Sequence, residues 1–173
     1  MNRLEINVNS DTLIITHLHS SPRHLIIVAK YSPVLWLLSM DTNGLHTSKS
    51  ILLTHLKKEI KDTRVIEAIR RVPREKFVLD NNQNRAYENT PLPIGHGQTI
   101  SQPSIIAIMI EALSLRRTDR VLELGTGSGY QAALLADICA EVLSTERIPP
   151  LAHSARSKLD SMGYSNTNIV SAG

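Results

Sequence analysis

The spacing of apolar residues predicts three helices between residues 50 and 113. The first begins near Ser50, and its apolar face holds Leu52, Leu53, Leu56 and Ile60. A second helix spans residues 65–72 and ends before Pro73, because proline cannot continue a helix. A third begins at Pro103, which suits a first helical turn, and its apolar face consists of Ile105, Ile106, Met109, Ile110 and Leu113. Residues 78–100 are rich in Asn, Pro and Gly, and they predict an extended loop region.

Short apolar runs alternate with helical patterns from residue 121 onward. Residues 121–124 (VLEL) and 142–145 (VLST) predict strands, and a third strand begins near Asn168. Helical patterns follow the first two strands, and Gly163 ends the second of these helices. Because strands alternate with helices, we expect an α/β fold with a doubly wound, mostly parallel sheet.

Residues 1–50 differ from the rest of the chain. Their short apolar runs have no sustained period of 2 or 3.6, so the sequence predicts no fold for this segment. His17, His19 and His24 have a spacing loosely like that of metal ligands, but no Cys, Asp or Glu cluster completes a set of ligands. We therefore expect surface histidines and no metal site.

Composition narrows the class of protein. The chain has 173 residues, the length of one ordinary domain, and its 42% hydrophobic and 20% charged residues are typical of globular proteins. A net charge of +3 is too small to indicate a nucleic-acid surface, and no apolar run is long enough for a membrane span. A single cysteine, Cys139, cannot form an intramolecular disulfide, and no secretory signal is recognisable. We expect a cytoplasmic protein that binds neither nucleic acid nor membranes, in which Cys139 is a small buried side chain.

Three alternate glycines follow the predicted strand at residues 121–124. Gly125, Gly127 and Gly129 occupy the place where α/β proteins bind ligands, beyond the carboxyl end of a strand. The dinucleotide fingerprint is G-x-G-x-x-G, whereas this loop reads G-x-G-x-G with Tyr130 after it. The spacing disfavours a nicotinamide dinucleotide.

Two acidic residues flank this loop. Glu123 precedes the first glycine, and Glu146 ends the next strand, where a carboxylate can accept both hydroxyls of a ribose. No Lys or Arg enters the loop, so a positively charged nucleoside without phosphate fits better than a dinucleotide. S-adenosylmethionine is such a molecule. The alternative is that both acids are solvated at strand ends and the glycines merely form a turn.

Three segments together resemble a known enzyme family. Residues 65–78 (VIEAIRRVPREKFV), 86–103 (AYENTPLPIGHGQTISQP) and 121–136 (VLELGTGSGYQAALLA) resemble, in this order, the protein-L-isoaspartate O-methyltransferases of bacterial or archaeal type. The middle segment is the most specific, since most class I methyltransferases share a glycine loop. The resemblance implies a Rossmann-like class I methyltransferase sheet preceded by N-terminal helices. It predicts a partial methyltransferase domain at residues 51–173 and an unmatched extension at residues 1–50.

This resemblance also implies a reaction and a site. The reaction is methyl transfer from S-adenosylmethionine to the α-carboxylate of L-isoaspartyl residues in damaged proteins, which is a repair step. Ser101 is the implied active-site residue, and Thr99, Ile100 and Gln102 shape the substrate side. The implied cofactor-binding residues are Glu123, Gly125, Thr126, Gly127, Ser128, Gly129 and Glu146. The alternative for Ser101 or Gln102 is that it only caps the helix at Pro103.

The chain also departs from the family pattern. In the family the third strand leads into an acid-bearing turn that reaches the adenine, and this sequence ends at Gly173, where that turn would begin. We therefore expect only the first half of the seven-stranded sheet, with strand 121–124 as an unpaired edge. The alternative to a truncated methyltransferase is an inactive remnant that binds a nucleoside weakly or serves as an interaction module.

Overall fold

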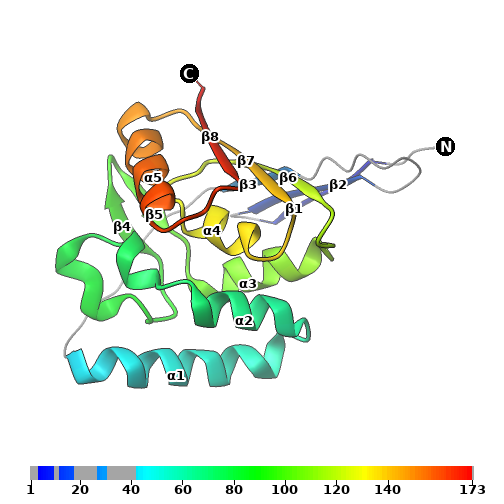
Figure 1. Ribbon diagram of the computed structural model, residues 1–173. Coiled ribbons are helices and arrows are strands. Elements are labelled where there is room, and N and C mark those ends of the chain that lie inside the picture. Colours follow the sequence, from blue (N-terminus) through cyan, green and yellow to red (C-terminus); the bar gives the residue numbers. More distant parts are fainter. Residues whose placement is uncertain (1–3, 10–11, 18–26, 31–41, 173) are drawn as a thin grey trace. The chain divides into compact units, whose positions relative to one another are not determined.

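The structure is a computed structural model that describes residues 4–9, 12–17, 27–30 and 42–172 (Figure 1). The chain divides into two compact units. The sheet unit contains residues 1–31 and 113–173, and the helical unit contains residues 32–112.

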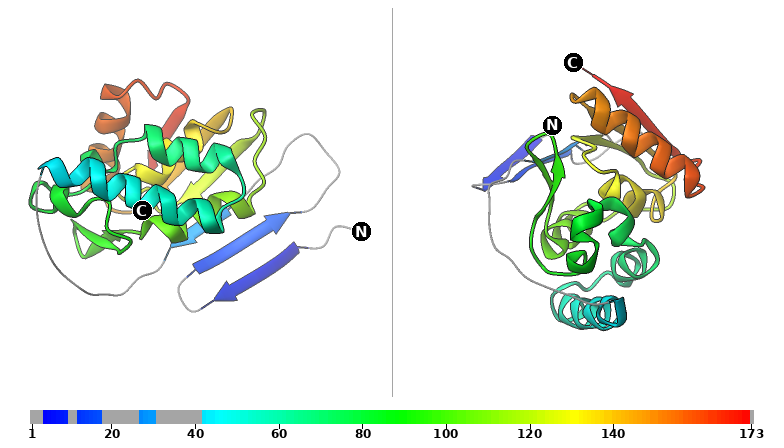
Figure 2. Two further views of the ribbon diagram at one scale, coloured as in Figure 1. Left: turned by 90° about the horizontal axis from the view of Figure 1, so that it is seen from below. Right: turned by 90° about the vertical axis from the view of Figure 1, so that its left-hand side faces the viewer.

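In the described part of the sheet unit, six strands form one sheet in the order β1-β2-β3-β6-β7-β8. Neighbours among β1, β2 and β3 run antiparallel, whereas β3, β6, β7 and β8 are parallel to one another. Figure 2 shows β1 and β2 side by side in opposite directions. The strands are β1 (Leu4–Asn9), β2 (Thr12–His17), β3 (Ile27–Lys30), β6 (Arg120–Leu124), β7 (Glu141–Glu146) and β8 (Thr167–Ser171).

The α/β fold and the three predicted strands after residue 120 are confirmed. Helix α4 (Tyr130–Ala136) connects β6 to β7, helix α5 (Pro149–Ser161) connects β7 to β8, and both helices pack against β7 and β8. Gly163 ends α5 as predicted, with a φ of +81°, and the next amide, of Tyr164, donates to the Leu159 carbonyl at 3.1 Å.

The prediction that strand 121–124 is an unpaired edge is wrong. In the sheet, β6 lies between β7 and β3, and residues 27–29 pair with residues 122–124 in parallel. Residues 1–50, for which the sequence predicted no fold, contribute three strands and the start of a helix. The six residues of β1 (LEINVN) do alternate between apolar and polar, so this period was overlooked. β3 has only four residues, and its parallel partner β6 is far away along the chain. His19 and His24 lie outside the described residues.

The helical unit contains the three predicted helices. They are α1 (Thr42–Glu59), α2 (Thr63–Arg71) and α3 (Pro103–Ala112), so the first begins earlier than the predicted Ser50. The predicted apolar faces of α1 and α2 are buried, except that Leu53 is partly exposed. On the predicted face of α3, Ile106, Met109 and Ile110 are buried, but Ile105 is exposed. None of the described helices is long and apolar enough to cross a membrane.

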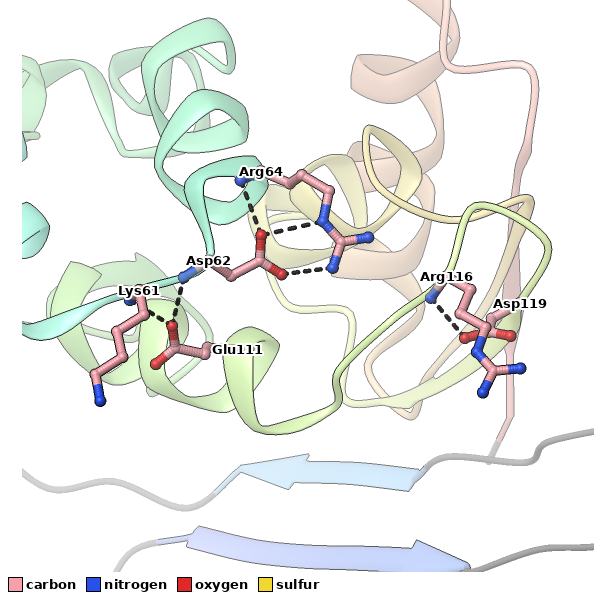
Figure 3. A network of polar contacts seen from close by, with 6 residues as sticks. All are labelled: Lys61, Asp62, Arg64, Glu111, Arg116 and Asp119. Carbon is pink, nitrogen blue, oxygen red and sulfur yellow. Dashed lines mark hydrogen bonds and ion pairs between the residues drawn. The ribbon is translucent and has the colours of Figure 1, made fainter.

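The turn between α1 and α2 is fixed by polar contacts within the helical unit. The amides of Lys61 and Asp62 donate to one carboxylate oxygen of Glu111 on α3, at 2.6 and 2.7 Å (Figure 3). Asp62 also caps α2 by accepting from the Arg64 amide at 2.9 Å. The hydrogen bond from the Arg64 side chain lowers the pKa of Asp62 below its ordinary value. Glu111 thereby links α3 to the start of α2.

The predicted loop at residues 78–100 contains regular elements. Two short 3-10 helices, η1 (Arg74–Phe77) and η2 (Asp80–Arg85), precede a hairpin of β4 (Leu92–Gly95) and β5 (Gln98–Ile100). The hairpin turn consists of His96 and Gly97, with φ values of 52° and 69°. Two-residue hairpin turns of this kind require positive φ, so the glycines that suggested a loop form a tight turn instead.

Candidate functional site

The glycine loop at residues 125–129 joins β6 to α4 in the sheet unit. The amides of Gly125 and Thr126 donate to the Thr145 carbonyl at 2.8 and 3.1 Å, which ties the loop to the carboxyl end of β7. The three glycines have φ values of +94°, +55° and +88°, a region that other residues rarely adopt. The loop therefore lies where ligands bind in α/β proteins.

Two of these glycines meet different surroundings. A Cβ atom on Gly125 would find no atom within 4 Å, so the backbone at this position borders open space. A Cβ atom on Gly129 would lie 3.2 Å from Cβ of Ala155 on α5, which is closer than nearly all real contacts. Gly125 thus leaves room for a ligand to approach the backbone, whereas Gly129 allows the helices to pack.

Glu146 is held beside the loop at the end of β7. Its side chain is buried, with one carboxylate oxygen accepting from the Gly127 amide at 2.8 Å and the other from the Ile148 amide at 2.9 Å. A carboxylate offers about four acceptor positions, so these two bonds leave capacity for further donors. The alternative of a solvated strand-end acid is wrong for Glu146.

Glu123 is also buried rather than solvated. Its side chain is only 1% exposed, and its carboxylate accepts from the Ser144 hydroxyl at 2.6 Å. The Ser144 hydroxyl in turn lies 2.5 Å from that of Thr126 in the loop. Thr126 and Ser128 are buried too. Glu123, the loop and Glu146 are thus brought together at the ends of β6 and β7.

The predicted substrate residues lie in the helical unit, between β5 and α3. Ile100 is buried, whereas Thr99, Ser101 and Gln102 are partly exposed. Among the described residues, the Ser101 hydroxyl makes no hydrogen bond, so a donor is available at this position. The Ser101 backbone carbonyl accepts from Nη2 of Arg74 at 2.7 Å.

The start of α3 is capped from elsewhere in the helical unit. The Ser104 amide donates to the Asn89 side chain at 2.9 Å, and the Gln102 amide group donates to the Ser104 hydroxyl at 2.8 Å. The side chain that caps the Ser104 amide is therefore that of Asn89, rather than that of Ser101 or Gln102.

Sequence reasoning missed three residues that support the site. Arg74 and Asn89 hold the segment around Ser101, and Ser144 connects Glu123 to the loop. Arg74 and Asn89 fall within the segments that resemble the methyltransferase family, which was the one available signal. Nothing in the period or composition of strand 142–145 distinguishes Ser144 from its neighbours.

The predicted site residues are divided between the two units. The cofactor-side residues belong to the sheet unit, and Thr99, Ile100, Ser101 and Gln102 belong to the helical unit. Within the described residues, no group of three or more His, Cys, Asp or Glu side chains is arranged to hold a metal ion.

The sequence profile of a known family matches residues 47–173. The family is protein-L-isoaspartate(D-aspartate) O-methyltransferase (PCMT), and the match covers most of the chain. The chain belongs to this family. The match begins slightly before the predicted domain boundary at residue 51.

Individual relatives agree with the family match. Protein-L-isoaspartate O-methyltransferase 2 of Marinobacter nauticus is 55% identical over 113 residues, which cover 65% of this chain and 52% of the relative. The protein-L-isoaspartate O-methyltransferase of Methanoculleus marisnigri is 55% identical over 111 residues, which cover 64% of this chain and 50% of the relative. The chain thus spans about half the length of the curated relatives it matches.

Solved structures of the family share the fold. A protein-L-isoaspartate O-methyltransferase superposes with a TM-score of 0.64 and 28% identity, covering 72% of this chain and 42% of the other. A Plasmodium falciparum chain described as a protein-L-isoaspartate O-methyltransferase, in complex with S-adenosyl-L-homocysteine, superposes with a TM-score of 0.61 and 27% identity. That match covers 72% of this chain and 62% of the other. The expected class I methyltransferase fold is confirmed.

Proposed function

We propose that this chain binds S-adenosylmethionine at the carboxyl ends of β6 and β7 and acts in methyl transfer to the α-carboxylate of L-isoaspartyl residues. The observation that carries this proposal is the glycine loop, in which Gly125 borders open space while Glu146 is fixed beside Gly127. Family membership supports the choice of cofactor and reaction.

The cofactor side uses backbone and acidic groups. Gly125 lets a ligand approach the main chain without meeting a side chain, and Thr126, Gly127, Ser128 and Gly129 complete the loop. Glu146 has acceptor positions left for the two hydroxyls of a ribose, since its hydrogen bonds from the Gly127 and Ile148 amides use one position on each oxygen. The loop contains no cation, which agrees with a ligand that has no phosphate.

The substrate side needs orientation more than acid–base chemistry. S-adenosylmethionine, when bound, supplies a methyl group on a positively charged sulfur. The nucleophile is a carboxylate with a pKa of about 4, so it is already ionised near neutral pH and needs no general base. The Ser101 hydroxyl donates a hydrogen bond that orients this carboxylate, and Thr99, Ile100 and Gln102 shape its surroundings. The rate then depends on alignment of the reacting atoms.

The partners in this proposal are proteins and peptides that contain L-isoaspartyl residues. We place the reaction in a reducing compartment such as the cytoplasm, because Cys139 is a buried free thiol.

Titration with S-adenosylhomocysteine tests the cofactor site. Glu146→Ala removes the ribose acceptor and Gly127→Val places a branched side chain in the loop, so each should weaken binding by about tenfold or more. Glu141→Ala is the matched control, because it removes an exposed acid from the other end of β7. Equal affinity in both loop variants and the control would exclude this site.

A second experiment tests Ser101. We expect Ser101→Ala to slow methyl transfer to an isoaspartyl peptide, because it loses about 1–3 kcal/mol of transition-state stabilisation. Affinity for S-adenosylhomocysteine should be unchanged. Ser50→Ala, an exposed serine of α1, is the control. Unaltered turnover would exclude the orienting role. Cofactor binding without any transfer by the unaltered chain would instead support the alternative of a nucleoside-binding module.

A further inference from the structure

Three polar side chains from three segments meet in the interior of the sheet unit. Ser144 of β7 lies between Glu123 of β6 and Thr126 of the glycine loop, at 2.6 Å from the Glu123 carboxylate and 2.5 Å from the Thr126 hydroxyl. Their exposed fractions are 0%, 1% and 4% respectively. Glu123 and Ser144 are also paired directly across the two strands, so both side chains lie on the same face of the sheet.

The direction of these hydrogen bonds follows from the groups themselves. Ser144 donates its single hydroxyl proton to the Glu123 carboxyl group. The Ser144 oxygen then accepts from Thr126, because Ser144 has no second proton to give. The three groups form a relay that runs from Thr126 through Ser144 to Glu123.

This relay restrains the loop at its centre. The Thr126 amide is bonded to the Thr145 carbonyl, and the Thr126 carbonyl accepts from the Gly129 amide at 2.9 Å. The side chain of Thr126 adds a third restraint to the same residue. The next residue, Gly127, directs its amide to Glu146. Fixing Thr126 therefore also fixes the backbone that holds the proposed ribose acceptor.

We infer that Glu123 and Ser144 are positioning residues, which act on the cofactor through Thr126 and the shape of the glycine loop. In this inference, which rests on the proposed function, the Glu123 carboxylate does not contact the ligand. It differs from the expectation drawn from the sequence, in which Glu123 was a binding residue. The relay also explains the hydroxyl groups of Ser144 and Thr126, which the glycine pattern alone does not explain.

Affinity for S-adenosylhomocysteine, measured by isothermal titration, tests the relay. Ser144→Ala and Thr126→Val each break it, so each should weaken binding by about 5- to 30-fold. Because both substitutions interrupt one relay, the double variant should bind no more weakly than the weaker single variant. Thr126→Ser retains the hydroxyl and should restore most of the affinity. Ser157→Ala, on the exposed side of α5, is the control.

Glu123→Gln separates the relay from direct binding. The glutamine keeps an oxygen that accepts from Ser144 but loses the charge, so affinity should fall by less than about threefold. If Glu123 instead contacted the amino group of the ligand directly, Glu123→Gln should weaken binding strongly and the two hydroxyl variants should not. A loss of tenfold or more in Glu123→Gln, with Ser144→Ala and Thr126→Val unaffected, would overturn the inference.

Amide hydrogen exchange provides a reading that needs no ligand. In Ser144→Ala we expect faster exchange at residues 125–129 and unchanged exchange in α5, whereas general destabilisation would affect both. If the unaltered chain does not bind S-adenosylhomocysteine, the proposed function fails. Amide hydrogen exchange at residues 125–129 then still tests whether the relay restrains the loop. Unchanged loop exchange in Ser144→Ala and Thr126→Val would overturn it.

Discussion

At the scale of single residues, burial changes the pKa of the Cys139 thiol. It is a buried free thiol whose Sγ donates to the Glu141 carbonyl at 3.5 Å, and burial raises its pKa from 9.0 to about 11. In the unfolded chain the thiol ionises near pH 9, whereas in the folded chain it keeps its proton up to about pH 11. The folded state then holds more protons between these values, so its stability should fall as pH rises through this window.

Two measurements check this prediction. Alkylation by iodoacetamide at pH 8 should be slow in buffer and fast in urea, because only the unfolded chain exposes the thiol. Urea unfolding of Cys139→Ala should depend less on pH between 9 and 11 than that of the unaltered chain. Equal pH dependence of the two proteins, or rapid alkylation in buffer, would contradict it.

At the scale of elements, the glycine loop and α5 depend on each other. Gly125→Ala and Gly129→Ala both place an alanine at positive φ, which costs roughly 1 kcal/mol. Only the second adds a Cβ atom 3.2 Å from Ala155 and 3.4 Å from Leu159. Crowding of this kind costs about 1–3 kcal/mol more, so Gly129→Ala should be the less stable variant in urea unfolding. Equal stability would show that α5 shifts freely.

Arg74 joins elements of the helical unit. Its side chain is 0% exposed and donates to the carbonyls of Ala86 and Ser101 at 2.8 and 2.7 Å. Arg74→Met fills similar space but leaves both carbonyls without this donor, so it should destabilise the chain by at least about 2 kcal/mol in urea unfolding. Lys76→Met, an exposed cation in the same 3-10 helix, should have little effect. Similar losses in the two variants would contradict the role of Arg74.

Local patterns predicted these elements unevenly. The helices α2 and α3 were predictable because each repeats the helical period over enough residues, and the ends of α2 and α5 were marked by Pro73 and Gly163. The strands β6 to β8 were predictable as short apolar runs that alternate with helical patterns. The hairpin of β4 and β5 was missed, since its strands are three or four residues long and its turn residues are those of any loop. In the site, Gly125 and Glu146 were identifiable from their place after strands. Arg74 and Ser144 were not, because their partners lie in other elements.

At the scale of the whole molecule, the sheet unit is built from two segments of the chain. Residues 1–31 and 113–173 belong to this unit, their described strands form one sheet, and the helical unit lies between them in the sequence. Pairing of β3 with β6 therefore closes a loop of roughly ninety residues, a step whose entropy cost grows only slowly with length. β6 was expected to be an edge because, by the family resemblance, its second neighbour would lie in the half that this sequence does not include. No local pattern predicts that residues 27–30 take that place.

Substitutions in β3 test this pairing. Val28 pairs with Ile14 of β2 and Glu123 of β6, so β3 is a central strand whose backbone is bonded on both sides. Val28→Pro removes an N–H group from the ladder and should destabilise the sheet unit by about 1–3 kcal/mol. Val28→Thr, which is also β-branched and keeps the N–H group, should retain most of the stability.

The outcome is read from urea unfolding together with hydrogen exchange in β6. If β3 covers β6, Val28→Pro should speed exchange at residues 121–124 as well as lower stability, because an uncovered edge strand exposes its backbone groups to water. It should also promote association at high protein concentration, since such an edge can pair with another chain. Equal stability and equal exchange in Val28→Pro and Val28→Thr would mean that β6 does not depend on residues 27–30. The edge predicted from the sequence would then be the correct description after all.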